Sequence, residues 1–160
     1  MEYRARAAIA ARARDGGRLA GRDPDHAEGN GALGVADRFR FVAGDLLEAN
    51  FGSGHAIATA GHILHSEGEA RSRALLEKTF DALAPGGTLA IAEILVDANR
   101  TAPLPALIFA VNMLVNSDQG DTFSFEEIAG WLLDAGFARV RTVDALGLAP
   151  RLILATKPGH

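Results

Sequence analysis

Three side chains that can exchange protons or bind ions lie near the ends of two apolar segments of the sequence. His62 and His65 come just after His55–Ala60, and Glu93 lies near the end of Thr88–Leu95. A neutral histidine can take a proton from a hydroxyl group, and a carboxylate beside it can fix the tautomer and stabilise the charged form. These residue types suggest general-base catalysis. From spacing alone, His65 is equally well read as a structural histidine at the entrance of a helix.

The same histidines raise the question of a metal site. His62, His65 and Glu69 offer three possible ligands, but the sequence has no cysteine, and no third histidine stands at ligand spacing. We therefore predict no metal site.

A strand–helix–strand unit is expected to position these residues. His55–Ala60 is short, apolar and bounded by glycines, which predicts a buried parallel strand. Ser66 to Glu69 matches a capping box, which predicts a helix that begins at Ser66 and ends near Pro85, before a second buried strand over Thr88–Leu95. Ligands of such units bind at the carboxyl ends of the strands, where His62, His65 and Glu93 are expected to lie together.

The predicted helix also bears on the state of His65. This residue directly precedes the expected N-cap, Ser66. The positive end of the helix dipole disfavours an imidazolium there, so the ring is expected to be neutral and basic.

Asp45 follows a short predicted strand over Phe39–Val42. A carboxylate at a strand's carboxyl end can accept hydrogen bonds from a ligand. Alternatively, Asp45 caps the turn 45–48, whose last residue is Glu48. Local sequence alone favours the cap.

Two helices and two strands are expected in the C-terminal half. Pro103 suits the first turn of a helix that runs to Asn116. One stripe of that helix is read as core: Leu104, Leu107, Ile108, Val111 and Leu114. The neighbouring stripe suits either a ligand pocket with polar anchors or a half-exposed helix edge; it consists of Phe109, Asn112, Met113 and Asn116.

A capping box, Ser124 to Glu127, predicts a further helix that ends at Gly136. Its apolar spacing predicts that Ile128, Trp131, Leu132 and Ala135 are buried. Arg139–Val143 and Arg151–Thr156 are expected to form an antiparallel pair of strands.

Residues 1–34 differ in composition from the rest of the chain. Arg, Ala, Gly, Asp and Glu dominate this segment, which predicts an irregular or helical segment with little to bury. The letters Gly29 to Gly34 match the dinucleotide pattern G-x-G-x-x-G, but no strand is predicted before them and a strand follows. We therefore do not assign phosphate binding to them.

Composition sets broad limits on class. The chain has 160 residues, 48% of them hydrophobic, which suits one globular domain with a core of its own. Its formal charge of -4 argues against a nucleic-acid surface. No apolar run is long enough to cross a membrane and no signal peptide is evident, so we expect a cytoplasmic protein without a membrane partner.

From residue 35 to residue 160 the chain resembles the class I S-adenosylmethionine-dependent methyltransferases, and more narrowly the small-molecule O-methyltransferases that act on hydroxyneurosporene and plant phenols. The resemblance rests on ADRFRFVAGDL, GHILHSEGEARSRALLEKTFDALAPGGTLAIAE, FAVNML and GDTFSFEEIAGWLLDAGF. It implies an α/β fold with a Rossmann-like sheet, mostly parallel with an antiparallel C-terminal strand. It also implies a small hydroxylated substrate and S-adenosyl-L-methionine as cofactor, with homodimers among full-length relatives.

The resemblance assigns roles to single residues. His65 is the general base and Glu93 the acid that orients it. Asp45 binds the adenine amine of the cofactor with Leu46 beside the ring, and Gly61 is also expected to contact the cofactor. His62 and the stripe Phe109, Asn112, Met113 and Asn116 are expected to contact the substrate.

The sequence departs from the family pattern in three places. It has no counterpart of the glycine-rich first motif or of the ribose-binding acid after the second strand, and Thr122 stands where the family has an acid. We therefore expect residues 35–160 to be a partial catalytic domain that lacks the first strands and is impaired in methyl transfer. The alternative is a non-catalytic remnant of the fold that serves as a binding or interaction module.

Overall fold

The computed structural model describes residues 45–145 and 148–159. The predicted strand Phe39–Val42 and the predicted irregular or helical segment 1–34 lie outside the described residues. The expectations about the first strands of the sheet fall there too.

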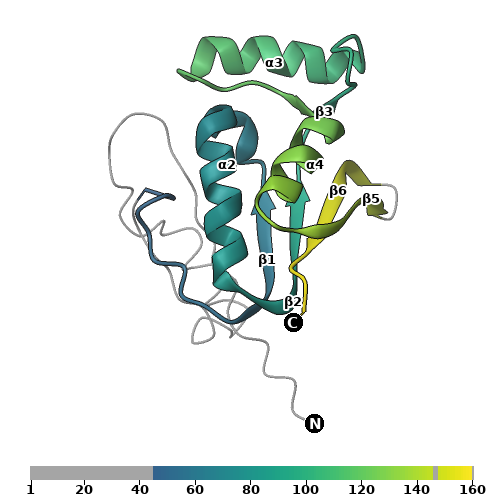
Figure 1. The fold of residues 1–160 in the computed structure, drawn as a ribbon. Helices are drawn as coiled ribbons and strands as arrows, with labels where there is room; N and C mark the ends of the chain where they lie inside the picture. Colours follow the sequence, from purple (N-terminus) through teal and green to yellow (C-terminus); the bar gives the residue numbers. More distant parts are fainter. Residues whose placement is uncertain (1–44, 146–147, 160) are drawn as a thin grey trace, which may run out of the picture.

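Within the described ranges, the main sheet consists of β1 (His55–Gly61), β2 (Leu83–Ala92), β5 (Ala138–Ala145) and β6 (Leu148–Thr156). Their order across the sheet is β1-β2-β6-β5 (Figure 1). β1 and β2 are parallel, whereas β6 is antiparallel to both β2 and β5. Three of these strands therefore run in one direction and β6 is reversed. This arrangement confirms the α/β, Rossmann-like, mostly parallel sheet and the antiparallel pair near the C-terminus.

Two helices cover one face of this sheet, α2 (Leu64–Ala82) and α4 (Phe125–Asp134), which lie side by side (Figure 1). The strand residues beneath them alternate in burial, since successive side chains of a strand point to opposite faces. The strands and both helices share one hydrophobic core, which includes Leu75, Leu76, Leu89, Ile91, Ile128, Trp131, Leu132 and Ile153.

β1 is parallel to β2 as predicted, but it is not buried. Ile57 is 63% exposed, and only Ala58 and Ala60 of this strand pack partly against the core. β1 stands at the edge of the described sheet, so it has one strand neighbour there instead of two. A short apolar segment predicts a strand but does not fix how many neighbours cover it.

α2 begins two residues earlier than predicted and is interrupted. Leu64 to Glu67 form a first turn, and Gly68 then adopts φ 71° and ψ 172° before the helix continues to Ala82. The Ser66 hydroxyl donates to the carbonyl of Ile63, so the capping box predicted at Ser66 and Glu69 is wrong. The glycine of that motif breaks the helix because it can adopt a backbone conformation outside the helical region.

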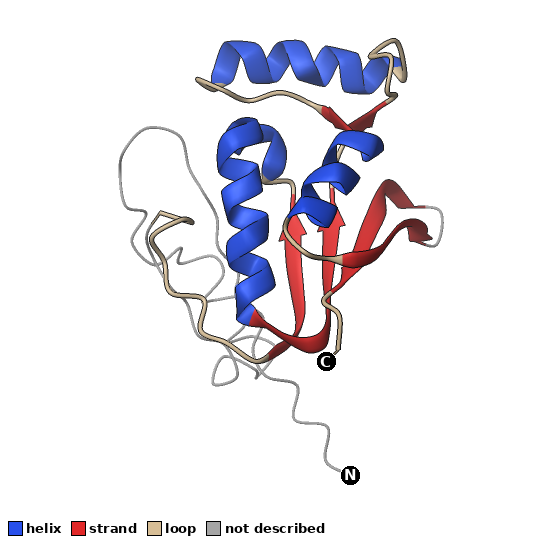
Figure 2. Cartoon of the chain, in the orientation of Figure 1, coloured by secondary structure: helices blue, strands red, loops and turns tan. Residues whose placement is uncertain are grey.

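α3 (Leu104–Asn116) crosses beyond the carboxyl ends of β1 and β2 (Figure 2). The helix was predicted correctly, but its supposed core stripe was not. Ala106 is the buried residue of this helix, whereas Leu104, Ile108, Val111 and Leu114 are 62–77% exposed. Apolar residues cover more than one side of α3, so the sequence period could not indicate which side faces the protein.

The last helix, α4, agrees closely with its prediction. Ser124 accepts a hydrogen bond from the Glu127 backbone N–H, and the Glu127 carboxylate accepts one from the Ser124 N–H. A short second sheet pairs β3 (Leu95–Val96) with β4 (Phe123–Ser124) just before this helix. Among the described residues, no helix combines the length and apolar character needed to cross a membrane.

Candidate functional site

The centre of the candidate site is a bonded pair, His65 and Glu93. The Nδ1 atom of His65 lies 2.8 Å from Oε2 of Glu93, and the Leu64 backbone N–H donates to Oε1 at 3.0 Å. The Glu93 side chain is 3% exposed and that of His65 is 12% exposed. Both carboxylate oxygens thus have partners, as a buried carboxylate requires. The predicted proximity of the two residues at the strand ends is confirmed.

The parallel pairing of β1 with β2 brings the two residues together. The paired register ends with Gly61 opposite Ala92, so His62 and Glu93 both follow directly at the same end of the sheet. The His62 N–H donates to the carbonyl of Ala92 at 2.8 Å, which extends the ladder by one bond. The chain then turns into α2, and this turn carries His65 back over Glu93.

His65 lies within the first turn of α2, not before its N-cap as the sequence suggested. Its carbonyl accepts the backbone N–H of Asp121 at 2.9 Å. A Cβ atom added to Gly120 would lie 2.7 Å from that same carbonyl oxygen, so the approach of the two segments requires a glycine at position 120. The backbone of His65 is therefore fixed from a second side, by the loop before β4.

The hydrogen bond to Glu93 determines the chemistry that His65 can perform. A carboxylate oxygen accepts, so in the neutral ring the proton resides on Nδ1 and the lone pair on Nε2. Nε2 is then available as a proton acceptor. The ring of Phe109 from α3 packs edge-on against the imidazole, with centroids 4.9 Å apart.

The predicted substrate stripe on α3 is only partly brought to this pair. Phe109 contacts His65, whereas Asn112 and Asn116 are exposed and bond to each other, Nδ2 of Asn116 donating to Oδ1 of Asn112 at 3.1 Å. Met113 is partly buried. His62 is exposed, and its ring centroid lies 6.1 Å from that of His65.

The Asp45 carboxylate is bonded within the protein. The Leu47 N–H donates to Oδ1 at 2.8 Å, and the Arg71 guanidinium donates to Oδ2 at 2.7 Å. The hydrogen bond from the Leu47 N–H, and to a smaller extent the one from Arg71, holds the pKa of Asp45 below its usual value. The alternative that Asp45 caps its own turn, Asp45 to Glu48, is confirmed.

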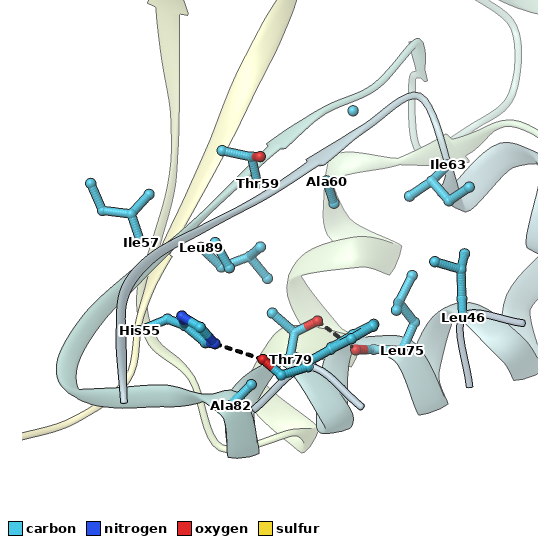
Figure 3. A pocket seen from close by; sticks show the side chains of 13 residues that line it. Leu46, His55, Ile57, Thr59, Ala60, Ile63, Leu75, Thr79, Ala82 and Leu89 are labelled. Atoms are coloured by element: carbon cyan, nitrogen blue, oxygen red, sulfur yellow. Dashed lines mark hydrogen bonds between the residues drawn. The ribbon is translucent and has the colours of Figure 1, made fainter. Parts of the chain in front are cut away.

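Leu46 and Gly61 line one pocket of about 250 Å³ between β1, α2 and the segment that follows Asp45 (Figure 3). Its lining is mostly apolar. Of its polar side chains, His55 donates from Nε2 to the carbonyl of Phe51, and Thr79 donates to the carbonyl of Leu75. The third is Thr59, and no Asp, Glu, Lys or Arg is among the described residues that line the pocket. Two residues that the resemblance assigned to the cofactor thus share a cavity.

Sequence reasoning missed the cations that hold the segment after Asp45 against α2. Lys78 donates from Nζ to the carbonyls of Leu46 and Leu47, at 3.1 and 2.5 Å, beside the Arg71 contact with Asp45. The available signal was their position on α2, seven residues apart and therefore on one face of the helix.

Thr122, which stands where the family has an acid, is fully buried, and its hydroxyl has no partner among the described residues.

Comparison with known proteins places this site in a family. Residues 26–138 match the model of the O-methyltransferase domain. The chain is 38% identical over 112 residues to 3-hydroxy-5-methyl-1-naphthoate 3-O-methyltransferase of Streptomyces sahachiroi, covering 70% of this chain and 32% of that protein. It is 33% identical over 127 residues to the tetracenomycin polyketide synthesis 8-O-methyl transferase of Streptomyces glaucescens, covering 79% and 37%.

Solved structures show the same relationship. A structure assigned as an O-methyltransferase of Nostoc punctiforme superposes with a TM-score of 0.76 at 27% identity, over 81% of this chain and 40% of that one. Human N-acetylserotonin methyltransferase, solved with S-adenosylmethionine, gives a TM-score of 0.68 at 25% identity, over 76% and 34%. The chain spans about a third of the length of the curated relatives it matches. By its sequence and its fold, the chain belongs to the O-methyltransferase domain family.

Proposed function

We propose that this chain carries the acid–base part of an O-methyltransferase that acts on a hydroxyl group of a small molecule. Bound S-adenosylmethionine would supply the methyl group: the hydroxyl oxygen would form a bond to the methyl carbon as the methyl–sulfur bond breaks. The hydroxyl proton passes to Nε2 of His65. The observation that carries the proposal is the 2.8 Å bond between Nδ1 of His65 and the buried Glu93 carboxylate.

That bond supplies what the reaction requires of a base. It keeps the Nε2 lone pair outward and stabilises the imidazolium that forms when Nε2 takes the proton. Glu93 acts through His65 and is therefore a positioning residue. Because Glu93 is fixed in turn by the Leu64 N–H, the base is held in one orientation before a substrate arrives.

Phe109 is proposed to form one wall of the acceptor site. Its ring contacts the imidazole of His65, which the first turn of α2 carries. α3 lies beyond the carboxyl ends of β1 and β2 (Figure 1). An aromatic wall beside a base suits a flat, hydroxylated acceptor, because such acceptors gain from stacking and apolar burial. Met113, Asn112, Asn116 and His62 are proposed as further contacts of the same acceptor.

The described residues fit only part of the cofactor. The pocket lined by Leu46 and Gly61 has the apolar character that an adenine ring requires, whereas no charged side chain lines it to meet the amino and carboxylate groups of the methionine moiety. Asp45, assigned by resemblance to the adenine amine, already has partners on both carboxylate oxygens. Among the described residues, only the adenine part of the cofactor thus has a fitting site.

The bonds that Asp45 makes within the protein, to the Leu47 N–H and to Arg71, favour a second candidate function. A chain that retains the fold but uses this acid to hold its own structure would act as a non-catalytic binding module. Turnover separates the two candidates.

The test is a radiolabelled-methyl assay with phenols and polyene alcohols as acceptors. It uses this chain and a chimera in which the N-terminal part of the Streptomyces sahachiroi relative precedes residue 35. In whichever protein turns over, His65→Ala is expected to lower kcat by ~10²–10⁴-fold. Glu93→Gln is expected to lower kcat with little change in KM, because its amide oxygen can still accept the Leu64 N–H. Glu69→Gln, which removes only a carboxylate bonded to Arg73, is the matched control.

Undiminished turnover of the His65→Ala protein would exclude His65 as the base. If neither the chain nor the chimera transfers methyl groups, the binding-module candidate replaces the enzyme.

A further inference from the structure

Three side chains of the types that bind metal ions meet at the carboxyl ends of β1 and β2. One donor atom each of His62, His65 and Glu93 lie within 4.8 Å of one another, a grouping found in the part of the chain that the structure describes. The third member is Glu93, 28 residues beyond His65, instead of the nearby Glu69. Glu69 bonds to Arg73 at 2.9 Å. We infer that His62, His65 and Glu93 form a binding site for a divalent transition-metal ion such as Zn²⁺.

The donor set determines which ions fit. Two imidazole nitrogens and one carboxylate oxygen suit Zn²⁺, Cu²⁺ and Ni²⁺, whereas Mg²⁺ and Ca²⁺ prefer oxygen ligands alone. With three protein ligands, a tetrahedral ion has a fourth position left for water. The proposed site is therefore selective for borderline metals over the alkaline-earth ions.

The geometry needs only a small adjustment. Zinc binds nitrogen and oxygen at ~2.0–2.2 Å, so its tetrahedral ligands stand roughly 3.3–3.5 Å apart. His65 Nδ1 and Glu93 Oε2 are 2.8 Å apart and must open slightly, while His62, whose ligand atom lies within 4.8 Å of the other two, must move closer. His62 is the exposed member, so its side chain can rotate without disturbing the core.

The backbone of His62 supports this arrangement. The residue has φ 52°, in the left-handed region that side-chain-bearing residues seldom adopt, and its N–H is bonded to the carbonyl of Ala92. This turn keeps the imidazole near His65 at the end of β1. An unusual conformation held by a hydrogen bond beside a cluster of ligands is typical of functional positions.

Metal binding would change the chemistry of His65. An ion bound by Glu93 Oε2 and the nearer ring nitrogen of His65 takes the Nδ1 lone pair, so the ring proton moves to Nε2. In that tautomer Nε2 donates and can no longer accept a proton. If the proposed function holds, the ion is a reversible inhibitor of proton removal. The metal site itself does not depend on that function.

The test is calorimetric titration of the protein with ZnCl₂, with MgCl₂ as the comparison ion. We expect one Zn²⁺ per chain and no measurable heat with Mg²⁺. His62→Asn is expected to weaken Zn²⁺ binding at least tenfold, and asparagine tolerates the left-handed backbone of position 62. His55→Asn and Glu69→Gln remove a histidine and a carboxylate outside the cluster and are expected to leave the affinity unchanged. Thermal unfolding of each variant checks that it is folded.

An equal affinity of the His62→Asn protein, or a loss of affinity in His55→Asn, would overturn the assignment, as would the absence of Zn²⁺ binding. The spectrum of bound Cu²⁺ gives an independent readout, since two coordinated imidazoles are expected and one in His62→Asn. Zn²⁺ binding without methyl transfer would leave this site intact and overturn the proposed function instead. Methyl transfer without Zn²⁺ binding would overturn the metal site and leave the proposed function intact.

Discussion

At the scale of single residues, the feature that decides the chemistry is a carboxylate removed from water. Glu93 is 3% exposed and would be costly to bury as an isolated anion. The Leu64 N–H and His65 Nδ1 each bond to one of its oxygens, which offsets the loss of hydration. The same bonds that make the buried carboxylate tolerable also fix the orientation of His65.

Gly68 is the residue at which backbone conformation matters most for the entrance of α2. Its φ of 71° lies outside the helical region, and an added Cβ would lie 2.6 Å from the carbonyl oxygen of Gln119. We predict that Gly68→Ala lowers the free energy of unfolding by about 1–3 kcal/mol, because alanine would be strained in this backbone conformation. The steric clash with Gln119 would add to this loss. Urea denaturation measures this change.

Gly130 offers the matched control for that substitution. It lies within α4, and a Cβ added there meets no atom within 4 Å. Gly130→Ala is expected to raise stability by about 0.5–1 kcal/mol, because alanine restricts the unfolded chain and suits a helix. Equal effects of the two substitutions would show that the conformation of Gly68 carries no special cost.

At the scale of elements, the site is assembled where four segments meet. β1 and β2 end side by side, α2 starts above them, and α3 crosses beyond the strand ends (Figure 1). The segment after Asp45 is held along α2 by Arg71 and Lys78. The parallel strand pair defines where His62 and Glu93 lie, and the first turn of α2 adds His65.

The capping box of α4 gives this element a predicted pH dependence. Burial alone would raise the pKa of Glu127, but hydrogen bonds from the Ser124 N–H and Arg100 outweigh it and hold the pKa below its ordinary value of 4.5. The ionised form is therefore favoured in the folded protein. Its contribution to stability is present above about pH 4.5 and is lost as the pH falls through the lowered pKa.

We therefore predict that Glu127→Gln lowers the melting temperature at pH 7, and that the difference from the unmodified protein shrinks as the pH falls below 4.5. Glu126→Gln, an exposed neighbour outside the capping box, is expected to leave this difference small at both pH values. Thermal melts between pH 3 and pH 7 measure it. A Glu127→Gln difference that is constant with pH would contradict the ionic role of the cap.

At the scale of the whole molecule, the described sheet is covered by helices on one face. α2 and α4 bury Leu89, Ile91 and Ile153 on that side, while β1 stands at the edge with Ile57 exposed. His65 and Glu93, the residues proposed to act in proton transfer, belong to this well-packed part. The pocket beside β1 that contains Leu46 and Gly61 is mostly apolar, and none of the described residues that line it is an Asp, Glu, Lys or Arg.

This division predicts weak binding of the cofactor by the chain alone. Correct placement of the reactants can lower a reaction barrier by up to ~7–11 kcal/mol. This effect is larger than the ~10²–10⁴-fold rate increase that general-base catalysis gives. No glycine-rich motif is predicted between a strand and a helix, and the described residues of the pocket include no Asp, Glu, Lys or Arg for the methionine moiety. Calorimetry with S-adenosylmethionine is expected to show weak or no binding, and the chimera is expected to bind more tightly. Tight binding by the chain alone would contradict this prediction.

The sequence alone determined the elements and the contact at the centre of the site. Periodicity and turn residues located β1, β2, α3, α4 and the antiparallel pair β5–β6, because these signals act over short distances along the chain. The rule that parallel strands present their carboxyl ends at one edge then predicted that His65 and Glu93 would meet.

Only the tertiary structure decided which faces are covered and which ligands gather. Exposure of β1 and of the apolar stripe on α3 depends on neighbours far away in sequence, so local patterns misjudged both. The break at Gly68 depends on the close approach of Gln119, and it displaced the predicted cap. Strand pairing keeps His62 and Glu93, 31 positions apart, at the same end of the sheet, whereas Glu69 bonds to Arg73 on its own helix and does not join the group.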